Sequence, residues 1–466
     1  MENKPIDIAI QFSQLIRTTL GPRGMNKCVV KGANTLITND GATILKNVVG
    51  GNPIIDMIRQ VAISQEEIIG DGTTTSVILA GQLLENAKNL TNKGLHPTTI
   101  INGYNLANVE CMKQLQGMSE EVDKKLICHT AFGSKLPKEQ VEHFTNLLLQ
   151  IDDFTNLTFV KIPHDDSMDS EIYPGFVFQA MTINDRVKKE RSGNVAVMDF
   201  RTNITEDVKI TSADEVLRAK TVRADYFKSI ADKLKSLDVQ TVFYTDTCPD
   251  LEAYLTENDL TGVVIFRREE LDNIANTTGA IVSADINLEN KLGKADIKFD
   301  KKGLCYIKGA RQSFILKGST RQVLDEIDRS IHDVISLLKN DTAAVVGAGA
   351  VEIELANNLY NFAKKVGGKE QLAIKAFAEA LESIPLIIAE NCGLDALEIL
   401  TNLKTMHEQG EKDMGVDIIV GISDARKRDI FEPVLVKIHA ISAANNVTNL
   451  ILKTDDFLQG DLDDKA

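Results

Sequence analysis

The sequence predicts a multidomain α+β protein, and three observations lead to this fold class. First, the chain has 466 residues, a length that allows roughly three domains. Second, apolar residues recur at helical spacing towards both ends of the chain. Third, residues 194–317 alternate short β-type runs with helical segments. This order predicts a compact α/β domain inserted into a mostly helical domain, whose two parts come from opposite ends of the chain.

The N-terminal region is expected to be mainly helical. A first helical pattern ends at a glycine–proline break, residues 21–24. Two short β-type runs, residues 27–30 and 35–38, then predict a hairpin. Helical periodicity follows through residues 53–116, with a break at residues 94–97.

The middle of the chain predicts strands at residues 195–198, 241–244 and 262–266, and a helix at residues 224–237. After Gly318 the apolar pattern is helical again. The helices predicted in this last region cover residues 323–338, 351–366, 370–389, 394–407 and 434–451.

The balance of charge disfavours two classes of partner. The chain has 52 Lys and Arg against 67 Asp and Glu, which gives a net charge of −15. Nucleic-acid binding and docking on anionic lipid both need a basic surface, so neither partner is expected. No run of about 18 apolar residues is present, and residues 1–7 lack the basic-then-apolar pattern of a signal peptide. We therefore expect no membrane segment.

The cysteines indicate the compartment. All six are scattered, and none belongs to a C-x-x-C pair, so a thiolate zinc site is not expected. Scattered thiols in a long chain are typical of a reducing environment. The sequence therefore predicts a cytoplasmic protein.

The most informative motif is residues 70–75 (GDGTTT), which stand directly before an apolar helical run. Glycines let the backbone approach a phosphate closely, and the first amides of a helix attract an anion. Asp71 can hold a divalent cation that a phosphate also binds. The alternative is an ordinary glycine turn followed by a capped helix, since Asp and Thr are common capping residues.

Three further glycine turns lie at predicted helix boundaries, in residues 20–24, 39–43 and 347–350. None is a Walker loop, because the chain has no G-x-x-x-x-G-K-[ST]. The G-x-G that begins at Gly347 lacks the third glycine of a dinucleotide-binding fingerprint. Each turn is a weak signal alone, but the four together predict one ligand that several loops hold.

Eight segments in one order resemble the signature motifs of group II chaperonins, the TCP-1 family of the archaeal thermosome and the eukaryotic cytosolic chaperonin. The resemblance covers nearly the whole chain, is strongest at both ends, and is closer to the thermosome than to a eukaryotic subunit. The segments are residues 17–25 (RTTLGPRGM), 38–45 (TNDGATIL), 70–75 (GDGTTT), 94–98 (GLHPT), 329–333 (RSIHD), 367–374 (GGKEQLAI), 389–395 (AENCGLD) and 431–437 (FEPVLVK).

The resemblance implies a three-part layout. A mostly helical equatorial ATP-binding domain would comprise residues 1–125 and 346–466. A small intermediate domain would comprise residues 126–190 and 318–345. The apical domain, residues 191–317, would bind substrate proteins and carry a helical lid protrusion near residues 210–237. Apolar residues of this protrusion would either face clients and neighbouring subunits or form a core: Val216, Leu217, Val222, Phe227 and Ile230.

The resemblance also implies an ATP site with three carboxylates. Asp71 would hold the Mg²⁺ that bridges the phosphates, and K⁺ is a second candidate ion. Asp40 and Asp333 would position or deprotonate the attacking water as catalytic residues. Taken singly, these residues also fit a helix cap at Asp40 and a solvated helix face at Asp333.

The remaining ATP contacts would come mainly from the glycine turns. Residues 20–22 would line the phosphates, threonines 73–75 would donate hydrogen bonds, and Gly349 would lie near the ribose. Glu432 would accept hydrogen bonds from ribose hydroxyls, the alternative being a simple turn. The full predicted ATP-binding set is Leu20, Gly21, Pro22, Asn39, Gly41, Gly72, Thr73, Thr74, Thr75, Gly349 and Glu432.

The implied function is that of an ATP-dependent chaperone. Homo- or hetero-oligomeric double rings would enclose non-native client proteins, with no nucleic acid or membrane involved. The alternative is a chaperonin-like paralogue that binds or assembles partners and hydrolyses ATP weakly. A stand-alone ATP-dependent enzyme is a weaker alternative, because the sequence offers no nucleophile–base pair.

Two departures from the family pattern favour the paralogue. Residues 161–166 fall where relatives carry a longer loop, with a lysine and paired glycines, that is thought to sense the γ-phosphate. Ala348 replaces the middle residue of the family's triple glycine, so its methyl group would crowd or shift the nucleotide.

Overall fold

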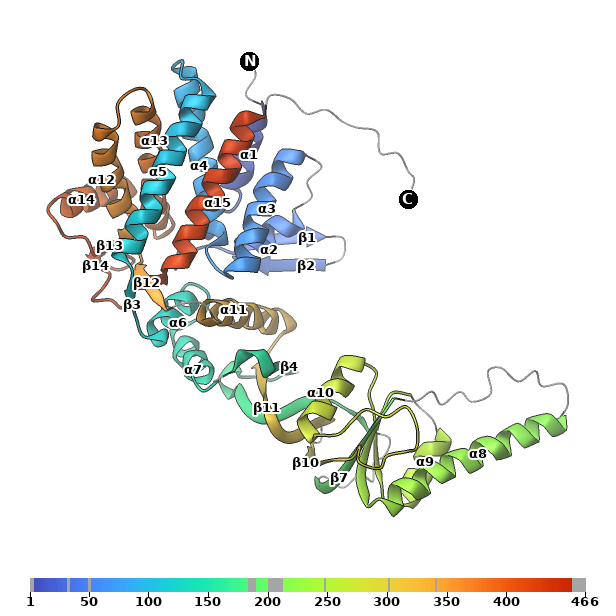
Figure 1. The fold of residues 1–466 in the computed structure, drawn as a ribbon. Coiled ribbons are helices and arrows are strands. Elements are labelled where there is room, and N and C mark those ends of the chain that lie inside the picture. The colour runs from blue at the N-terminus through green and yellow to red at the C-terminus, as the bar shows by residue number, and fades with distance from the viewer. Residues whose placement is uncertain are drawn as a thin grey trace. The chain divides into compact units, whose positions relative to one another are not determined.

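The computed structural model describes residues 4–31, 34–48, 52–151, 153–182, 190–199, 213–246, 249–300, 302–339 and 342–454. The chain divides into two compact units (Figure 1). The first unit combines residues 1–150 with residues 320–466, and the second comprises residues 151–319. None of the helices described has the length and apolar character needed to cross a bilayer.

The first unit is mainly helical, and it contains both ends of the chain. Its helices are α1 (Lys4–Gln14), α2 (Gly41–Asn47), α3 (Pro53–Ile68), α4 (Thr73–Asn92), α5 (Pro97–Met118), α6 (Lys124–Gly133), α7 (Lys138–Leu148), α11 (Arg321–Lys339), α12 (Ala350–Lys365), α13 (Glu370–Asn391), α14 (Ala396–Glu408) and α15 (Val434–Lys453). Its strands are β1 (Lys27–Lys31), β2 (Asn34–Thr38), β3 (Glu120–Glu121), β12 (Ala343–Val346), β13 (Met414–Asp417), β14 (Gly421–Asp424) and β15 (Phe431–Pro433).

Helix α4 runs through the core of the first unit. It packs against α1, α3, α13 and α15 (Figure 1). Its residues from Ser76 to Gly81 are all buried. A helix that is apolar on every side must be covered on every side, so the sequence of α4 requires this central place. The helix start at Thr73 is thereby held in a fixed frame.

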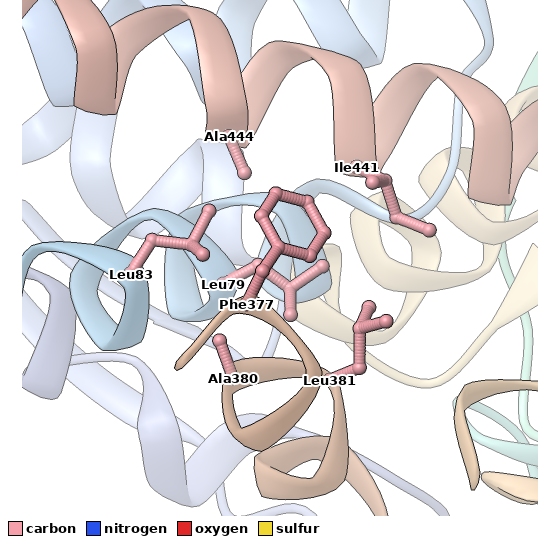
Figure 2. A pocket seen from close by; sticks show the side chains of 7 residues that line it. All are labelled: Leu79, Leu83, Phe377, Ala380, Leu381, Ile441 and Ala444. Carbon is pink, nitrogen blue, oxygen red and sulfur yellow. The ribbon is translucent and has the colours of Figure 1, made fainter. Parts of the chain in front are cut away.

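The core around α4 is apolar and closely packed. Figure 2 shows seven side chains that line a small pocket between α4, α13 and α15. Phe377 is 1% exposed and meets Tyr104 edge to face, with ring centroids 5.6 Å apart. The pocket offers no polar group to a ligand, so it belongs to the core: Leu79, Leu83, Phe377, Ala380, Leu381, Ile441 and Ala444.

The second unit is built on one mixed sheet. Its strands are β4 (Leu157–Pro163), β5 (Glu171–Gln179), β6 (Met181–Thr182), β7 (Glu190–Met198), β8 (Val239–Tyr244), β9 (Thr261–Val264), β10 (Gly293–Phe299) and β11 (Leu304–Gly318). Their order is β4-β11-β10-β7-β8-β9-β6, and β5 also pairs with β11. Its helices are α8 (Ala213–Ser236), α9 (Pro249–Glu257) and α10 (Arg268–Thr278).

Helices cover both faces of this sheet because its central strands are apolar on both sides. In β7, Ala196 and Met198 pack with α8 and α9, whereas Val195 and Val197 pack with α10. Successive side chains of a strand point to opposite faces. A continuous apolar run such as residues 195–198 therefore needs a helix layer on each side.

The predicted helices and strands are confirmed in both units. The hairpin is β1–β2, the strands of the middle region are β7, β8 and β9, and the five C-terminal helices are α11 to α15. Several strands were not predicted. Strands β3, β6, β12, β13, β14 and β15 have two to four residues, too few to show a period, whereas β4, β5, β10 and β11 have seven to 15 residues.

The predicted lid protrusion falls partly on α8. Phe227 and Ile230 are 0% and 1% exposed and belong to the core between α8, α9 and the sheet, whereas Val222 is 63% exposed. Residues 210–212 and the side chains of Val216 and Leu217 lie outside the described residues. Phe227 and Ile230 are therefore core residues, as the alternative prediction had it. Val222 is the exposed residue among these three.

The loop predicted at residues 161–166 does not begin at Lys161. Residues 161–163 belong to strand β4, where Lys161 pairs with Leu316 of β11. The strand is held by parallel pairing with β11, from Leu157 opposite Gln312 to Pro163 opposite Gly318. The prediction of a loop for these three residues was wrong.

Candidate functional site

Asp40 lies at the start of helix α2. Its side chain accepts a hydrogen bond from the Thr43 amide at 2.7 Å, and its own amide is bonded to Thr38 Oγ1 at 3.1 Å. Asp40 is therefore an N-cap, as the simpler interpretation predicted. The cap also fixes the carboxylate in one orientation at the end of strand β2.

Asp71 lies directly before the start of helix α4. Gly72 is the N-cap residue with φ +78°, a left-handed conformation that favours glycine. Its amide donates to Asp71 Oδ1 at 2.8 Å, and Gln65 Nε2 donates to the Asp71 carbonyl at 2.8 Å. Thr73 is 5% exposed, while Thr74 and Thr75 are half-buried. Residues 70–75 thus form a helix N-terminus with a fixed acid in front of it, which suits an anion together with a cation.

Two glycines bring these helix starts and α11 into contact. A side chain on Gly41 would place its Cβ 2.6 Å from Thr74 Oγ1. A side chain on Gly70 would place its Cβ 2.5 Å from Ser336 Cβ and 3.3 Å from the Asp333 carbonyl oxygen. Only glycine permits such close approach at both places. The starts of α2 and α4 and the middle of α11 are therefore close to one another.

A largely buried lysine joins the carboxylates. Lys135, just after α6, lies with Nζ 2.6 Å from Asp333 Oδ2 and 4.0 Å from Asp71 Oδ1. The side chains of Lys135 and Asp333 are 14% and 19% exposed. Asp40 also acts on this ammonium electrostatically. The structure thus brings Asp71 and Asp333 together at one cation, with Asp40 close enough to act on it through its charge.

Burial and charge shift the pKa values in this cluster in opposite senses. Burial by itself lowers the pKa of Lys135, but Asp333, Asp71 and Asp40 together raise it well above its usual value. Burial raises the pKa of Asp333 to about 6, an effect that Lys135 opposes and that Asp71 and Asp40 reinforce. Lys135 therefore stays charged, and Asp333 titrates close to neutral pH.

Lys135 is the member of this charged cluster that the sequence did not reveal. It follows Gly133 and Ser134 at the end of α6, and this Gly-Ser-Lys turn was the available signal. The signal is weak because lysine is common in such turns on protein surfaces. Its importance follows from partners up to 198 residues away in the chain.

A divalent cation fits this cluster. Among the described residues, no three His, Cys, Asp or Glu side chains are grouped closely enough to hold a metal by themselves. Mg²⁺ usually takes only one or two carboxylates and completes its shell with phosphate and water. The ammonium of Lys135 shows that these carboxylates stabilise a positive charge between them. Asp71, in front of the helix α4 N-terminus, is placed to share a cation with a phosphate.

Helix α13 supports two of the predicted glycine turns. Gly21 has φ +86° and lies against Ile388, and Gly349 has φ +81° and lies against Pro385. Asn391, at the end of α13, donates from Nδ2 to the carbonyl oxygens of Leu20 at 2.8 Å and Arg17 at 3.1 Å. The turn formed by Leu20, Gly21 and Pro22 is thereby fastened to the same helix as Gly349.

The methyl group of Ala348, the residue before Gly349, lies on the side of strand β13. Ala348 has φ +57°, and its methyl group packs against Gly415 of β13 and the small core around Phe431. Its carbonyl oxygen accepts a hydrogen bond from the Val416 amide at 2.9 Å.

Glu432 lies on strand β15, opposite Val345 of β12. A side chain on Gly347 would place its Cβ 2.9 Å from Glu432 Oε1. A side chain on Gly72 would meet Val436, in the first turn of α15, at 2.6 Å. The segment that carries Glu432 therefore contacts both Gly347 and the start of α4.

Comparison with known proteins gives a single family. The family model of the TCP-1/cpn60 chaperonin family matches residues 12–461. The chain is 32% identical over 498 residues to thermosome subunit 2 of Haloferax volcanii, covering 98% of this chain and 89% of that protein. It is 31% identical to thermosome subunit alpha of Archaeoglobus fulgidus, over 96% of this chain and 90% of the relative. The same identity holds for thermosome subunit alpha of Thermoplasma acidophilum, over 97% and 90%.

Proposed function

Because this chain belongs to the TCP-1/cpn60 chaperonin family, we propose that it is an ATP-hydrolysing chaperonin subunit that assists protein folding. The observation that supports this function best is the convergence of Asp40, Asp71 and Asp333 on Lys135, beside the N-terminus of α4. Three acids from distant parts of the chain around one buried cation suit a charged ligand that carries its own metal ion.

In this proposal the three acids divide the work of hydrolysis. Asp71 holds Mg²⁺, with K⁺ as a second candidate ion. Mg²⁺, when bound, neutralises charge on the β- and γ-phosphates. Asp40 and Asp333 orient the attacking water and accept its proton. A base is most effective when its pKa lies near the working pH, and the pKa of Asp333, about 6, meets that condition.

Lys135 restrains Asp333 until the nucleotide binds. Its ammonium occupies Asp333 Oδ2 at 2.6 Å, so this oxygen is not available to water in the structure described. Phosphate oxygens of ATP would compete for the same ammonium. Transfer of Lys135 from Asp333 to phosphate would free the carboxylate when substrate is present.

The other predicted residues complete the ATP site. The phosphates are lined by Leu20, Gly21 and Pro22 together with residues 72–75. The flanking residues Asn39 and Gly41 bring Asp40 close to the phosphates. Gly349 lies near the ribose, and Glu432 accepts from ribose hydroxyls. The turn on α13 and the contact between Gly72 and Val436 support this assignment.

We also propose the family's domain layout and assembly for this chain. Residues 1–125 and 346–466 form the equatorial domain, residues 126–190 and 318–345 the intermediate domain, and residues 191–317 the apical domain. Homo- or hetero-oligomeric double rings in the cytoplasm enclose non-native proteins. ATP turnover then closes the lid through the intermediate domain.

The test separates catalysis from helix capping at Asp40. Asn caps helices as well as Asp does, so Asp40→Asn keeps the bond to the Thr43 amide but removes the carboxylate. We expect Asp40→Asn to bind ATP normally and to lose ATP turnover by roughly 100-fold or more. Asp395→Asn, at the cap of α14, is the matched control and should keep full turnover. Unchanged turnover in Asp40→Asn would refute the catalytic role.

The assembly is tested on the purified chain alone. Particles imaged with and without ATP should be double rings that change shape on nucleotide addition. Monomers that hydrolyse no ATP would overturn the proposal for the chain acting alone. Rings without turnover would support the paralogue instead.

A further inference from the structure

A buried triad of charges lies behind Glu432. Lys437, in the first turn of α15, lies with Nζ 2.7 Å from Glu352 Oε1 and 2.6 Å from Glu432 Oε2. Lys437 and Glu352 are 4% and 1% exposed, whereas the Glu432 side chain is 28% exposed. The triad thus has two covered members and one that reaches solvent.

The triad carries one more negative charge than a buried lysine needs. A single carboxylate would neutralise Lys437, and leaving any buried charge unpaired costs several kcal/mol. Glu352 already supplies that partner at 2.7 Å. The excess charge therefore resides at Glu432, the member that solvent reaches.

Lys437 favours the ionised form of Glu432, although the pKa of this carboxyl is raised on balance. Burial raises the pKa of Glu432, Lys437 opposes this shift, and Glu352 reinforces it. Burial by itself lowers the pKa of Lys437, but Glu352 and Glu432 together raise it above its usual value. Without the ammonium, the two neighbouring carboxylates would repel each other, and Glu432 would take up a proton more readily.

The two oxygens of Glu432 have different surroundings. Oε2 is engaged by Lys437. Oε1 lies over Gly347, 2.9 Å from the place where a Cβ would be, and no donor to it occurs among the described residues. Glu352 belongs to the first turn of α12, whose N-cap is Gly349. Lys437 therefore ties the Gly347–Gly349 turn, through Glu352, to the strand that presents Glu432.

We propose that Lys437, supported by Glu352, is a positioning residue that fixes Glu432 Oε2 and leaves Oε1 to accept hydrogen bonds from a ribose hydroxyl of the nucleotide. This inference rests on the proposed ATP site. A charged acceptor makes a hydrogen bond about twice as strong as a neutral one. A site built for a hydroxyl also rejects the analogue that lacks it, because its acceptor is then left unpaired. The triad therefore makes the site selective for ribonucleotides over deoxyribonucleotides.

The test is a double variant that removes the cation without adding net charge. Lys437→Met combined with Glu352→Gln deletes one positive and one negative group and leaves Glu432 in place. The matched control is Lys404→Met with Glu382→Gln, which removes another Lys–Glu pair, 2.7 Å long and with Glu382 9% exposed. The readouts are kcat and KM of the full chain for ATP, 2′-deoxyATP and 3′-deoxyATP.

For the unaltered chain, we expect KM to be about tenfold lower for ATP than for at least one deoxy analogue. In the Lys437/Glu352 variant, the ratio of KM for that deoxy analogue to KM for ATP should fall to about one, because only KM for ATP rises. The value of kcat should change less than about twofold. The control pair should keep the ratio. Equal increases of KM for all three nucleotides would show a purely structural role and overturn the inference, as would an unchanged ratio.

Two further outcomes keep the inference separate from the proposed function. Turnover of ATP and both deoxy analogues with equal KM by the unaltered chain would overturn the inference while leaving ATP hydrolysis intact. Absence of any ATP turnover or binding would overturn both. If the double variant does not fold, Glu352→Gln alone decides. It leaves Lys437 wholly to Glu432, so the ratio should be kept or increased, and its loss would contradict the proposal.

Discussion

Lys135 Nζ and Asp333 Oδ2 lie 2.6 Å apart although 198 residues separate them in the chain. The pair joins α11 to the turn after α6. It places the Lys135 ammonium beside a carboxyl group whose pKa is raised by burial. Because Asp333 titrates near pH 6, this contact decides the pH range in which the carboxylate can act as a base.

We expect ATP turnover to fall as the pH is lowered through about 6, because a protonated Asp333 cannot accept a proton from water. Lys135→Met removes the cation that favours the ionised form in the nucleotide-free protein, so the acidic limb of the kcat/KM profile should move to higher pH. The measurement is kcat/KM for ATP at saturating Mg²⁺ between pH 5 and pH 8. Lys138→Met, at an exposed lysine at the start of α7, is the control. An unshifted profile in Lys135→Met would contradict the assignment of Asp333 as the base.

Asn391→Ala should loosen the turn at Leu20 to Pro22, because it deletes both hydrogen bonds that fasten the turn to α13. We expect KM for ATP to rise several-fold and the stability to fall by about 1–3 kcal/mol. Asn258→Ala, which loses a comparable bond to the Tyr254 carbonyl in the second unit, should leave KM unchanged. Equal effects of the two substitutions on KM would remove Asn391 from the nucleotide site.

Ala348→Gly should raise the free energy of unfolding by up to about 1 kcal/mol, because a left-handed φ strains a residue that carries a Cβ. ATP turnover should remain, since the methyl group packs against Gly415. The companion Ala350→Gly, in the first turn of α12, should instead destabilise by about 1 kcal/mol. Chemical denaturation and kcat measure both. A many-fold gain in turnover for Ala348→Gly would show that the methyl group crowds the nucleotide after all.

Phe377→Ala should destabilise the first unit by about 3–5 kcal/mol, because a buried ring in the core shown in Figure 2 leaves a cavity behind. The unfolding midpoint in denaturant measures the loss. Leu372→Ala, on the same helix at 42% exposure, should cost less than about 1 kcal/mol. Similar losses for the two variants would mean that the core around α4 is not closely packed.

Much of the fold could be predicted because it depends on local periodicity. The helices of both ends have apolar residues at helical spacing, and strands β7, β8 and β9 contain short apolar runs rich in β-branched and aromatic residues. Strands β12 and β15 escaped prediction because three or four residues show no period. The loop predicted at Lys161 failed because pairing with β11 extends strand β4 through that residue.

The sequence by itself determined where the acids and glycines of the candidate site stand, since Asp40 and Asp71 each precede a helix whose apolar run is evident. Only the tertiary structure decided what opposes their charge. Lys135 and Lys437 look like ordinary surface lysines in the sequence, yet each is enclosed by carboxylates from distant elements. The physical reason is that a buried ammonium is stable only beside acids, and those acids become its neighbours only when the two ends of the chain pack into one unit.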